Sequence, residues 1–361
     1  MKKNLFKIFL AALTVTLSAV SCSKDDNPKD QDNQGKVIVI NQGNYSDQSG
    51  SISLYDENTN AITNHIYETA NGVSIGAIII SGCITPDKTA ALVCNYPDKI
   101  IFINPATGAD TGTSITDGLV SPRNIAIGKN YTYVTNWGAT HIVTETGTWE
   151  FNKSYIAIYD NLTLTLQKEV VVGSDAEGIL INDDRLYVAV KEGVVVYDID
   201  GKNIEKVGVV KPSGYTSGAR YIVSDGMSKI WASFPGDGIA RINPTSLEVM
   251  SKVDVPVDSM DGYITSDSDG ENIYTYYTIF DATYTAKEAH IYKVNIYNNN
   301  ITDLYTGTYF YGAGVSPVTG NIFTAEVSFT SNSVLKVVAS SDGTIRNSAT
   351  AAIGTCRYLF F

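Results

Sequence analysis

The feature that most constrains this chain is an ending shared by a series of short apolar runs. Each run alternates β-branched or aromatic side chains and then reaches an Asp or Asn, whose side chain can close an Asx turn. Six copies occupy residues 50–56, 99–105, 155–160, 193–198, 238–244 and 291–295, and a looser seventh occupies 334–338. Their Asx residues stand about 38 to 56 positions apart, which is the repeat length of a four-stranded propeller blade with variable loops.

A second strand precedes the shared ending in every repeat. It occupies residues 37–40, 90–93, 131–134, 185–189, 229–232, 272–275 and 321–324. Turn dipeptides such as Pro86-Asp87 and Asp183-Asp184 stand before most of these strands, and a turn between two such strands predicts a β-hairpin. Shorter first strands lie further upstream, at 123–127, 178–181 and 220–223.

The two ends of the chain favour a closed ring over an open stack of repeats. The first repeat begins at its second strand, residues 37–40, and the chain finishes with a lone strand at 356–361. If that last strand completes the first blade, no long sheet edge stays unpaired. An open solenoid would need polar capping repeats, and none is visible. We therefore predict an all-β fold: a seven-bladed β-propeller over residues 35–361, its first blade closed by the C-terminal strand.

The N-terminus has the pattern of an export signal. Lys2 and Lys3 precede an apolar stretch at 5–20, and we predict a signal peptide over residues 1–21. The alternatives to a lipoprotein signal are a plain cleaved secretory peptide and a membrane anchor too short to span comfortably.

A cysteine follows this segment directly. Residues 19–22, Ala-Val-Ser-Cys, resemble the lipobox of bacterial lipoproteins, so Cys22 is the predicted lipidation site. The polar run over 22–34 offers no apolar segment to bury and predicts a disordered tether. Its acidic start resembles the signal that sends lipoproteins of Bacteroidota to the outer face of the outer membrane, although an ordinary solvated linker would look similar. These resemblances imply a lipid-anchored protein at the cell surface.

Composition and motifs argue against several classes of function. The chain of 361 residues has a formal net charge of -12 and no cluster of Lys and Arg, so nucleic acid is not an expected partner. No His-Glu-x-x-His or Walker-type motif occurs, and His65, His141 and His290 lie in different repeats. We therefore expect neither catalytic residues nor a metal site. A metal held on the axis by separate blades would escape a motif search, so a metal-dependent hydrolase or lyase is the alternative.

Three cysteines remain beyond Cys22: Cys83, Cys94 and Cys356. An odd set allows at most one disulfide among them. Buried free thiols are the expected state, with a single pair as the alternative because an exported protein meets an oxidising compartment.

Propeller architecture lets the sequence indicate a binding face. The first strand of each blade lies nearest the axis, and the links into it share one face with the links from second to third strands. The residues entering the first strands are Gly76, Arg123, Glu177, Arg220, Asp261, Gly314 and Arg357. They predict a polar ring at the channel mouth, with Arg123, Arg220 and Arg357 as candidate ligand contacts. Alternatively, these charges pair with one another and plug the channel, because buried charges need partners.

The links from second to third strands carry an excess of large aromatic side chains. The candidate contacts there are Tyr45, Tyr96, Asn136, Trp137, Phe234, Tyr277, Phe280 and Phe329. Further rings, Trp149, Phe151 and Tyr284, fall in the longest insertions, at 138–153 and 279–289. Rings gathered on one face favour ligand recognition, because aromatic contacts bury a large area at low entropic cost. Some of them are alternatively expected to fold inward as caps over the blades.

The blade endings, the lipobox and the strand-swapped closure together resemble the YncE-like propeller lipoproteins of Bacteroidota. Within that group the chain is similar over most of its length to the BtuG-type cobalamin-capturing proteins. The resemblance implies a surface lipoprotein that binds cobalamin and related corrinoids, needs no cofactor, and delivers its ligand to a TonB-dependent outer-membrane transporter. A surface adhesion or scaffold protein, which would bind a macromolecule, is a further alternative.

Overall fold

The computed structural model describes residues 35–258 and 261–361. The predicted signal peptide at 1–21, the lipidation site Cys22 and the tether at 22–34 lie outside the described residues. Contacts group Gly35–Phe361 into one unit. No helix in the two described ranges is long and apolar enough to cross a membrane.

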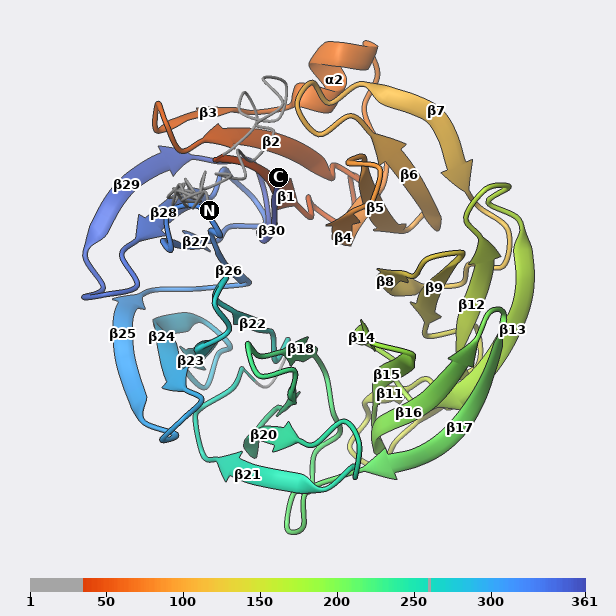
Figure 1. The fold of residues 1–361 in the computed structure, drawn as a ribbon. Coiled ribbons are helices and arrows are strands. Elements are labelled where there is room, and N and C mark those ends of the chain that lie inside the picture. The colour runs from red at the N-terminus through yellow and green to blue at the C-terminus, as the bar shows by residue number, and fades with distance from the viewer. Residues whose placement is uncertain (1–34, 259–260) are drawn as a thin grey trace, which may run out of the picture. The chain divides into compact units, whose positions relative to one another are not determined.

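Within these ranges, seven four-stranded antiparallel sheets stand around a central axis (Figure 1). The strands of blades 1 to 4 are given from the axis outward. Blade 1 contains β30 (Thr355–Phe360), β1 (Lys36–Asn41), β2 (Ser51–Asp56) and β3 (Ala61–Thr63). Blade 2 contains β4 (Ile78–Ile84), β5 (Ala90–Asn95), β6 (Lys99–Ile103) and β7 (Asp110–Ile115). Blade 3 contains β8 (Pro122–Ile127), β9 (Tyr131–Asn136), β12 (Ser154–Asp160) and β13 (Leu166–Gly173). Blade 4 contains β14 (Ile179–Asn182), β15 (Arg185–Val190), β16 (Gly193–Asp200) and β17 (Asn203–Val210).

The other three blades repeat this order. Blade 5 contains β18 (Ile222–Ser224), β19 (Ile230–Phe234), β20 (Gly238–Ile242) and β21 (Val249–Val253). Blade 6 contains β22 (Ile264–Ser266), β23 (Asn272–Phe280), β24 (Ala286–Asn295) and β25 (Ile301–Gly307). Blade 7 contains β26 (Ala313–Val315), β27 (Ile322–Glu326), β28 (Val334–Val338) and β29 (Ile345–Thr350). A two-stranded hairpin, β10 (Ile142–Val143) with β11 (Trp149–Glu150), is added to blade 3.

The last strand of the chain closes the ring. β30 pairs antiparallel with β1, and Val39 lies opposite Tyr358. The closing strand runs so close to blade 7 that a Cβ added at Gly312 would lie 1.7 Å from the Cys356 carbonyl oxygen. Only glycine allows the two backbones to approach this closely. The predicted all-β, seven-bladed propeller, closed by the C-terminal strand, is confirmed.

The core lies between the blades, because each blade is covered on both faces by its neighbours. In β1, five of the six residues are buried, which explains why the middle strands look almost continuously apolar in sequence. Val39 and Tyr55 of blade 1, for example, pack with Phe323 of blade 7. Outer strands such as β17 leave most of their residues exposed, so the buried fraction of residues decreases from the inner strands of a blade to its outermost strand.

The repeated Asp or Asn has the predicted role. The Asp56 carboxylate accepts a hydrogen bond from the Asn58 N–H at 2.8 Å. The Asn104 side-chain oxygen accepts one from the Ala106 N–H at 2.9 Å. The same bond two residues ahead is made by Asp160, Asn243 and Asn295. The Asx turn therefore marks the end of the third strand in these blades.

A short helix that the sequence pattern did not indicate lies in the link from blade 1 to blade 2. This helix, α2 (Ile66–Asn71), buries Ile66 and Tyr67. The Tyr67 hydroxyl donates a hydrogen bond to the Asp110 carboxylate at 2.7 Å, which fixes the helix against β7. Six residues are too few to establish a helical period, so tertiary contacts decide this element.

The cysteines of the propeller are free thiols, as predicted. Cys94 and Cys356 are buried in the same apolar cluster, whereas Cys83 is partly exposed. Burial raises the pKa of the Cys94 and Cys356 thiols to about 12, so both stay protonated and unreactive at neutral pH.

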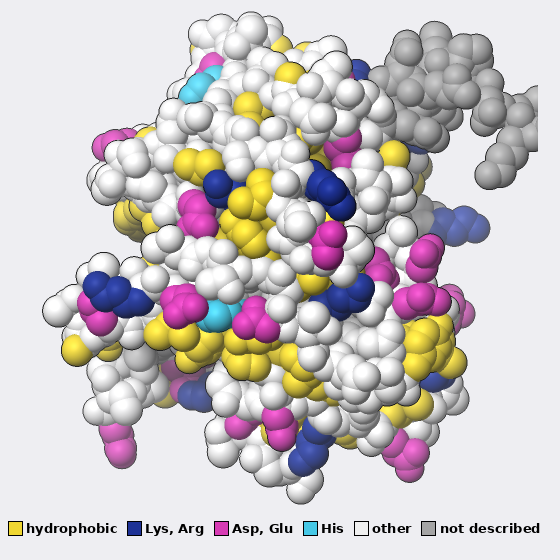
Figure 2. Space-filling view, turned by 90° about the vertical axis from the view of Figure 1, so that its left-hand side faces the viewer, with side chains coloured by type: hydrophobic (Ala, Val, Ile, Leu, Met, Phe, Trp, Pro, Cys, Tyr) yellow, Lys and Arg dark blue, Asp and Glu magenta, His cyan; other side chains and the backbone are white. Residues whose placement is uncertain are grey.

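The outer side of the ring carries mixed charges. On the side of β25 and β29, Figure 2 shows Lys and Arg scattered singly among acidic and apolar side chains. This side offers no basic tract of the kind that a phosphate backbone requires.

Buried tyrosines predict a loss of stability at alkaline pH. Burial raises the pKa of Tyr133 to about 12, and its hydroxyl donates to the Gly201 carbonyl at 2.8 Å. Its stabilising contribution is complete below pH 10, the ordinary tyrosine pKa, and is lost as the pH rises towards 12. We expect the wild-type advantage over Tyr133→Phe in unfolding free energy to shrink by about 1 kcal/mol between pH 8 and pH 11. Urea titrations at the two pH values measure this, and an unchanged difference would contradict it.

Candidate functional site

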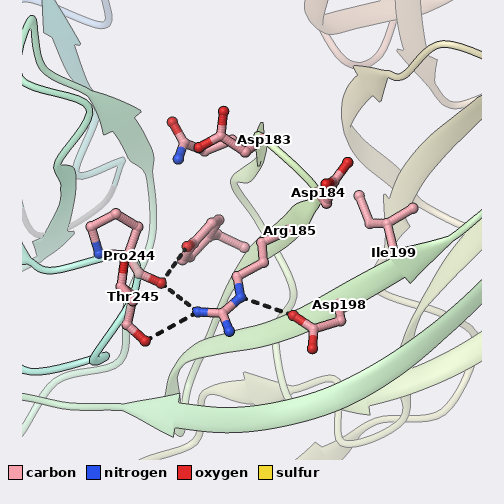
Figure 3. Close-up of a pocket in the computed structure, with 9 residues that line it drawn as sticks. Asp183, Asp184, Arg185, Asp198, Ile199, Pro244 and Thr245 are labelled. Carbon is pink, nitrogen blue, oxygen red and sulfur yellow. Dashed lines mark hydrogen bonds and ion pairs between the residues drawn. The ribbon is translucent and has the colours of Figure 1, made fainter.

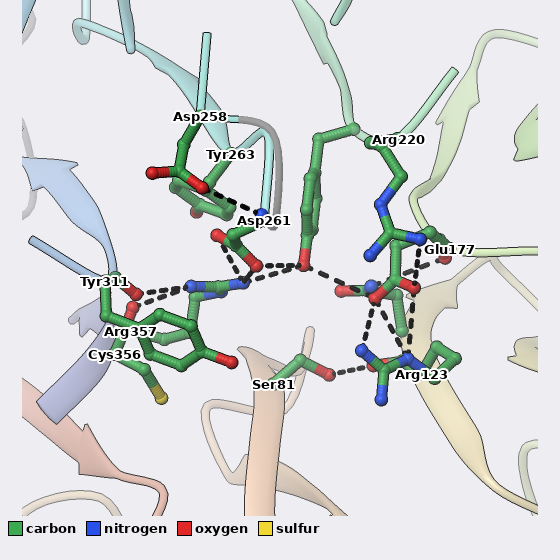
Figure 4. A network of polar contacts seen from close by, with 12 residues as sticks. Ser81, Arg123, Glu177, Arg220, Asp258, Asp261, Tyr263, Tyr311, Cys356 and Arg357 are labelled. Atoms are coloured by element: carbon green, nitrogen blue, oxygen red, sulfur yellow. Dashed lines mark hydrogen bonds and ion pairs between the residues drawn. The ribbon is translucent and has the colours of Figure 1, made fainter. Parts of the chain in front are cut away.

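Five charged side chains from the entrances of the inner strands meet near the axis (Figure 4). They are Arg123 in β8, Glu177 before β14, Arg220 before β18, Asp261 before β22 and Arg357 in β30. All five were predicted for the polar ring. Gly76 and Gly314 contribute no side chain, and a Cβ at Gly314 would lie 3.0 Å from the Tyr358 Cβ.

Glu177 is the centre of one half of this network and is only 1% exposed. Arg123 donates to its carboxylate through Nη2 at 2.8 Å and through Nε at 3.0 and 3.1 Å. Nη1 of Arg220 lies 3.5 Å from the other side of the carboxylate. Burial by itself lowers the pKa of Arg123, but attraction to Glu177 outweighs it and leaves that pKa above its ordinary value. One buried carboxylate therefore holds two guanidinium groups.

Asp261 is the centre of the other half. Nη2 of Arg357 lies 3.0 and 3.2 Å from its two carboxylate oxygens, and the Tyr276 hydroxyl donates to it at 2.7 Å. The Arg357 guanidinium also lies 4.2 Å from the centre of the Tyr263 ring, a cation–π contact. Nη1 donates to the Tyr311 and Cys356 carbonyls at 3.2 and 2.9 Å, so both terminal nitrogens of this guanidinium bind protein groups.

The Tyr221 hydroxyl joins the two halves. It accepts a hydrogen bond from Nη2 of Arg357 at 2.7 Å and lies 3.2 Å from Asp261 and 3.4 Å from Glu177. Burial raises the pKa of Tyr221 well above its ordinary value, so the hydroxyl keeps its proton. With one proton, it donates to one carboxylate at a time. The charges at the channel mouth are therefore paired with one another, which is the second of the two arrangements that the sequence left open.

A line of aromatic rings crosses the same face over four blades. Tyr45 and Tyr96 are 64% and 46% exposed and stack with their ring centres 4.8 Å apart. The Asn44 side chain donates to the Phe329 carbonyl at 2.8 Å and so ties the loop that carries Tyr45 to blade 7. The ring centres of Phe329 and Tyr309 lie 6.4 Å apart, and those of Tyr309 and Phe280 lie 5.7 Å apart. We call Tyr45, Tyr96, Phe329, Tyr309 and Phe280 the aromatic arc.

Trp137 connects the axis to a second group of rings. The Arg123 guanidinium lies 4.0 Å from the centre of the Trp137 ring. The Phe151 ring stacks on the Trp137 ring, with the two ring centres 4.8 Å apart. The backbone N–H of Trp137 donates to the Ser121 carbonyl at 3.1 Å, which places this link beside the link into β8. The charged network and Trp137 therefore form one continuous surface.

The insertion that carries β10 and β11 is anchored to blade 4. The Phe151 N–H donates to the Asp175 carboxylate at 2.8 Å, and Glu150 pairs with Lys191. Trp149 is exposed and stacks on His141 at 4.3 Å. The insertion therefore presents a second aromatic surface at the edge of the face.

Three predicted contacts do not face the ligand surface. Phe234 is fully buried and packs edge-on against Tyr215 at 5.2 Å, so the prediction of an exposed ring there is wrong. Asn136 is fully buried because its side chain accepts from the Val120 N–H and donates to the Val134 carbonyl, both at 3.0 Å.

Tyr277 is the third misplaced residue. It lies inside β23 rather than in a link, because β23 runs on to Phe280, and its partner across the sheet is His290. The structure thus brings together Arg123, Trp137, Arg220 and Arg357 near the axis and Tyr45, Tyr96, Phe280 and Phe329 in the arc.

Sequence reasoning missed the tyrosines that complete the network. Tyr221, Tyr263, Tyr276, Tyr309 and Tyr311 were not among the candidates. Tyr221 follows Arg220 directly and Tyr263 lies two residues after Asp261, so their proximity to polar first-strand entrances was the available signal.

Cavities occur on the opposite face, where first and second strands turn. One of about 270 Å³ lies between blades 4 and 5 (Figure 3). Its Arg185 donates to Asp198 at 2.8 Å and to the carbonyls of Pro244 and Thr245. Among the described residues, no group of three or more His, Cys, Asp and Glu side chains is arranged to hold a metal ion.

Solved structures with the same fold come from several bacteria. A 6-phosphogluconolactonase candidate from Bacteroides fragilis is 12% identical, with a TM-score of 0.65 over 91% of this chain and 98% of that one. The periplasmic gluconolactonase PpgL from Pseudomonas aeruginosa is 11% identical, with a TM-score of 0.61 over 89% and 98%. Apo AztD from Citrobacter koseri is 8% identical, with a TM-score of 0.58 over 90% and 96%. At these identities the likeness establishes the propeller fold alone.

No curated protein sequence matches the chain. A family model does match, over residues 35–353, which is nearly the whole propeller. The chain therefore belongs to the DUF5074 family, described as a domain of unknown function.

Proposed function

We propose that this protein is a cell-surface lipoprotein that binds cobalamin and related corrinoids on its aromatic face. The observation that supports the proposal best is the exposed Tyr45–Tyr96 stack, which continues through the aromatic arc beside a closed polar centre. A corrinoid is a large, flat disc edged with amides. In the proposal the rings of the aromatic arc supply flat apolar contact area for the disc. Arg123 and Arg220 of the charged network supply hydrogen-bond donors for its amide oxygens.

In the proposal the ligand rests on the face beside the paired charges at the axis, rather than on the axis itself. Arg357 acts in this scheme as a positioning residue, since Asp261 and Tyr221 already hold its guanidinium. No bond to the cobalt of the corrinoid is required.

Lipidation at Cys22 would hold the protein in the outer membrane, and the polar residues at 22–34 would allow the ring to reach a transporter. Delivery to a TonB-dependent receptor follows in the proposal from the resemblance to corrinoid-capturing lipoproteins. The ligand surface would then be the face that the receptor meets.

The proposal predicts saturable binding of cyanocobalamin by isothermal titration calorimetry. The double variant Tyr45→Ala, Tyr96→Ala should bind at least about tenfold more weakly, because two exposed rings each contribute on the order of 1 kcal/mol or more to such a contact. Tyr297→Ala is the matched control, since Tyr297 is 62% exposed in a turn on the opposite face. Absence of heat with cyanocobalamin, adenosylcobalamin and cobinamide would overturn the proposal.

A hydrolase is the second candidate. It is favoured by two axial carboxylates, Glu177 and Asp261, held among arginines, and by the names of the lactonase structures that share the fold. Hydrolysis of 6-phosphogluconolactone faster than its spontaneous rate, abolished in Glu177→Gln, would make the enzyme the better assignment. Spontaneous hydrolysis alone would leave the binding function.

A further inference from the structure

A cavity larger than the one in Figure 3 lies on the face opposite the aromatic arc, between blades 2 and 3. Its volume is about 710 Å³, within the range of sites for small organic ligands, roughly 300 to 1,000 Å³. The turn around Asp87 and the outer strand β7 form its blade 2 side, and the turns at 127–132 and 161–164 form its blade 3 side. Nothing in the proposed function uses this cavity.

Smaller cavities extend it along the same face. A cavity of about 240 Å³ shares Gly128 and Lys129 with it. The cavity of about 270 Å³ in Figure 3 shares Asp183, Asp184 and Ile199 with that second cavity. The shared lining residues make the three cavities neighbours on this face, and we call the three together the turn groove. A ligand that contacts all three cavities has to be chain-like.

Hydroxyl groups in the large cavity present acceptors to a ligand. The Thr111 hydroxyl donates to the Phe102 carbonyl at 2.9 Å and lies 2.7 Å from the Thr113 hydroxyl. Because the Thr111 hydroxyl proton is used in the bond to the Phe102 carbonyl, the Thr113 hydroxyl is the donor of the second bond. The Thr111 oxygen also accepts from the Thr113 N–H at 3.4 Å, so both of its lone pairs are used. Thr113 is exposed and lines the cavity, so its hydroxyl oxygen is the acceptor that a ligand can reach.

Charge in the large cavity is balanced. The Asp87 carboxylate accepts from the Thr85 hydroxyl, which keeps the pKa of Asp87 below its ordinary value despite partial burial. Lys129 is exposed on the other side of the cavity. One carboxylate opposite one ammonium favours a neutral ligand. The net charge of -12 further disfavours an anionic polymer.

Aliphatic side chains interrupt this polar lining. Leu162 is 95% exposed at the lip of the cavity, and Leu164 and Ile127 line it from half-buried positions. A lining of aliphatic patches between hydrogen-bond acceptors matches a sugar ring, which alternates C–H surface with hydroxyl donors. In the large cavity a cationic peptide fits less well, because Lys129 would repel it. Asp183 and Asp184 line only the two smaller cavities.

We propose that the turn groove binds a neutral oligosaccharide, as a second site on the face opposite the aromatic arc. Sugar hydroxyls would donate to Asp87 and Thr113, and the C–H faces would cover Leu162 and Leu164. Lys129 would donate to a sugar oxygen where the large cavity meets the next one. The proposal is independent of corrinoid binding.

Saturation-transfer NMR on the purified full chain tests this with maltohexaose, xylohexaose and mannohexaose as probes. At least one hexaose should show saturation transfer, and Thr113→Trp should raise its Kd at least tenfold by filling the cavity. Thr302→Trp is the matched control, because Thr302 is also an exposed threonine of an outermost strand, β25, away from the groove. It should bind as wild type does.

The outcomes separate the two proposed sites. Cyanocobalamin binding measured in parallel should be unchanged in Thr113→Trp, and a thermal unfolding curve like that of wild type shows independently that the variant is folded. No saturation transfer from any of the three hexaoses, or equal Kd values for Thr113→Trp and wild type, would overturn the proposal. Binding of hexalysine in place of the hexaoses would overturn it as well, because the groove would then select positive charge.

Discussion

Replacing Glu177 with alanine should lower the free energy of unfolding by about 3 to 5 kcal/mol, the cost of removing one partner from a buried ion pair. Glu177 is almost fully buried and accepts three hydrogen bonds from Arg123. Its removal leaves two guanidinium groups, those of Arg123 and Arg220, close together with no carboxylate between them. Urea or guanidinium denaturation of both proteins at neutral pH measures the difference.

Two controls separate the role of this charge from a general effect of substitution. Glu177→Gln retains the shape and one acceptor oxygen, so its loss of stability should fall between wild type and Glu177→Ala. Asp198→Ala breaks the exposed ion pair with Arg185 and should cost less than about 1 kcal/mol. A Glu177→Ala protein within 1 kcal/mol of wild type would mean that the axial network does not hold the blades together.

Deleting residues 355–361 should abolish cooperative folding, a larger effect than any single substitution. The deletion removes β30, which supplies the inner strand of blade 1 and pairs with β1 from Val37 to Asn41. It also removes Arg357 from the axis and exposes the apolar clusters that Cys356 and Leu359 complete. An unpaired β1 would be a long apolar edge, which promotes aggregation. Near-ultraviolet circular dichroism and thermal unfolding of the truncated protein measure the loss.

A permuted chain provides the matched control. The end of β30 lies beside the start of β1, since Val37 pairs with Phe360 and the Phe361 N–H donates to the Lys36 carbonyl at 3.2 Å. A two-residue Asn-Gly turn can therefore join residues 355–361 to the beginning of the propeller as a hairpin. This permutant should unfold cooperatively again. If the truncated protein unfolds as cooperatively as the full chain, the closing strand is not essential to the ring.

The sequence predicted the fold because its signals are local. Alternation of apolar residues and an Asx turn are both properties of contiguous segments. The side chains of Asp56, Asn104 and Asp160 each accept the expected hydrogen bond from the backbone N–H two residues later. The ring closure followed from counting, since one blade lacked its first strand and one strand at 356–361 lacked a blade. The helix α2 was missed because it depends on Tyr67 contacting Asp110, which is distant in sequence.

The candidate site was predicted less completely, because exposure and pairing depend on the neighbouring blades. Tyr45 lies in the link after β1 and Phe234 is the last residue of β19, and the sequence placed both in links after second strands; yet Tyr45 is exposed, whereas Phe234 is fully buried against Tyr215. Asn136 looked like a contact for a ligand amide, but the backbone of Val120 takes its side-chain oxygen. The position of a residue in the repeat decides on which face of the propeller it lies. The residues packed around it in the folded protein decide whether its side chain points to solvent or into the core.

The sequence by itself therefore determined the strands, their turns, the number of blades and the way that the ring closes. Only the tertiary structure decided that Glu177 binds Arg123 and Arg220, that Asp261 binds Arg357, and that Tyr221 lies between them. The physical reason is that strand and turn signals act over a few residues of backbone. Contacts across the axis join side chains from different blades, and these meet only after all seven blades have closed around it.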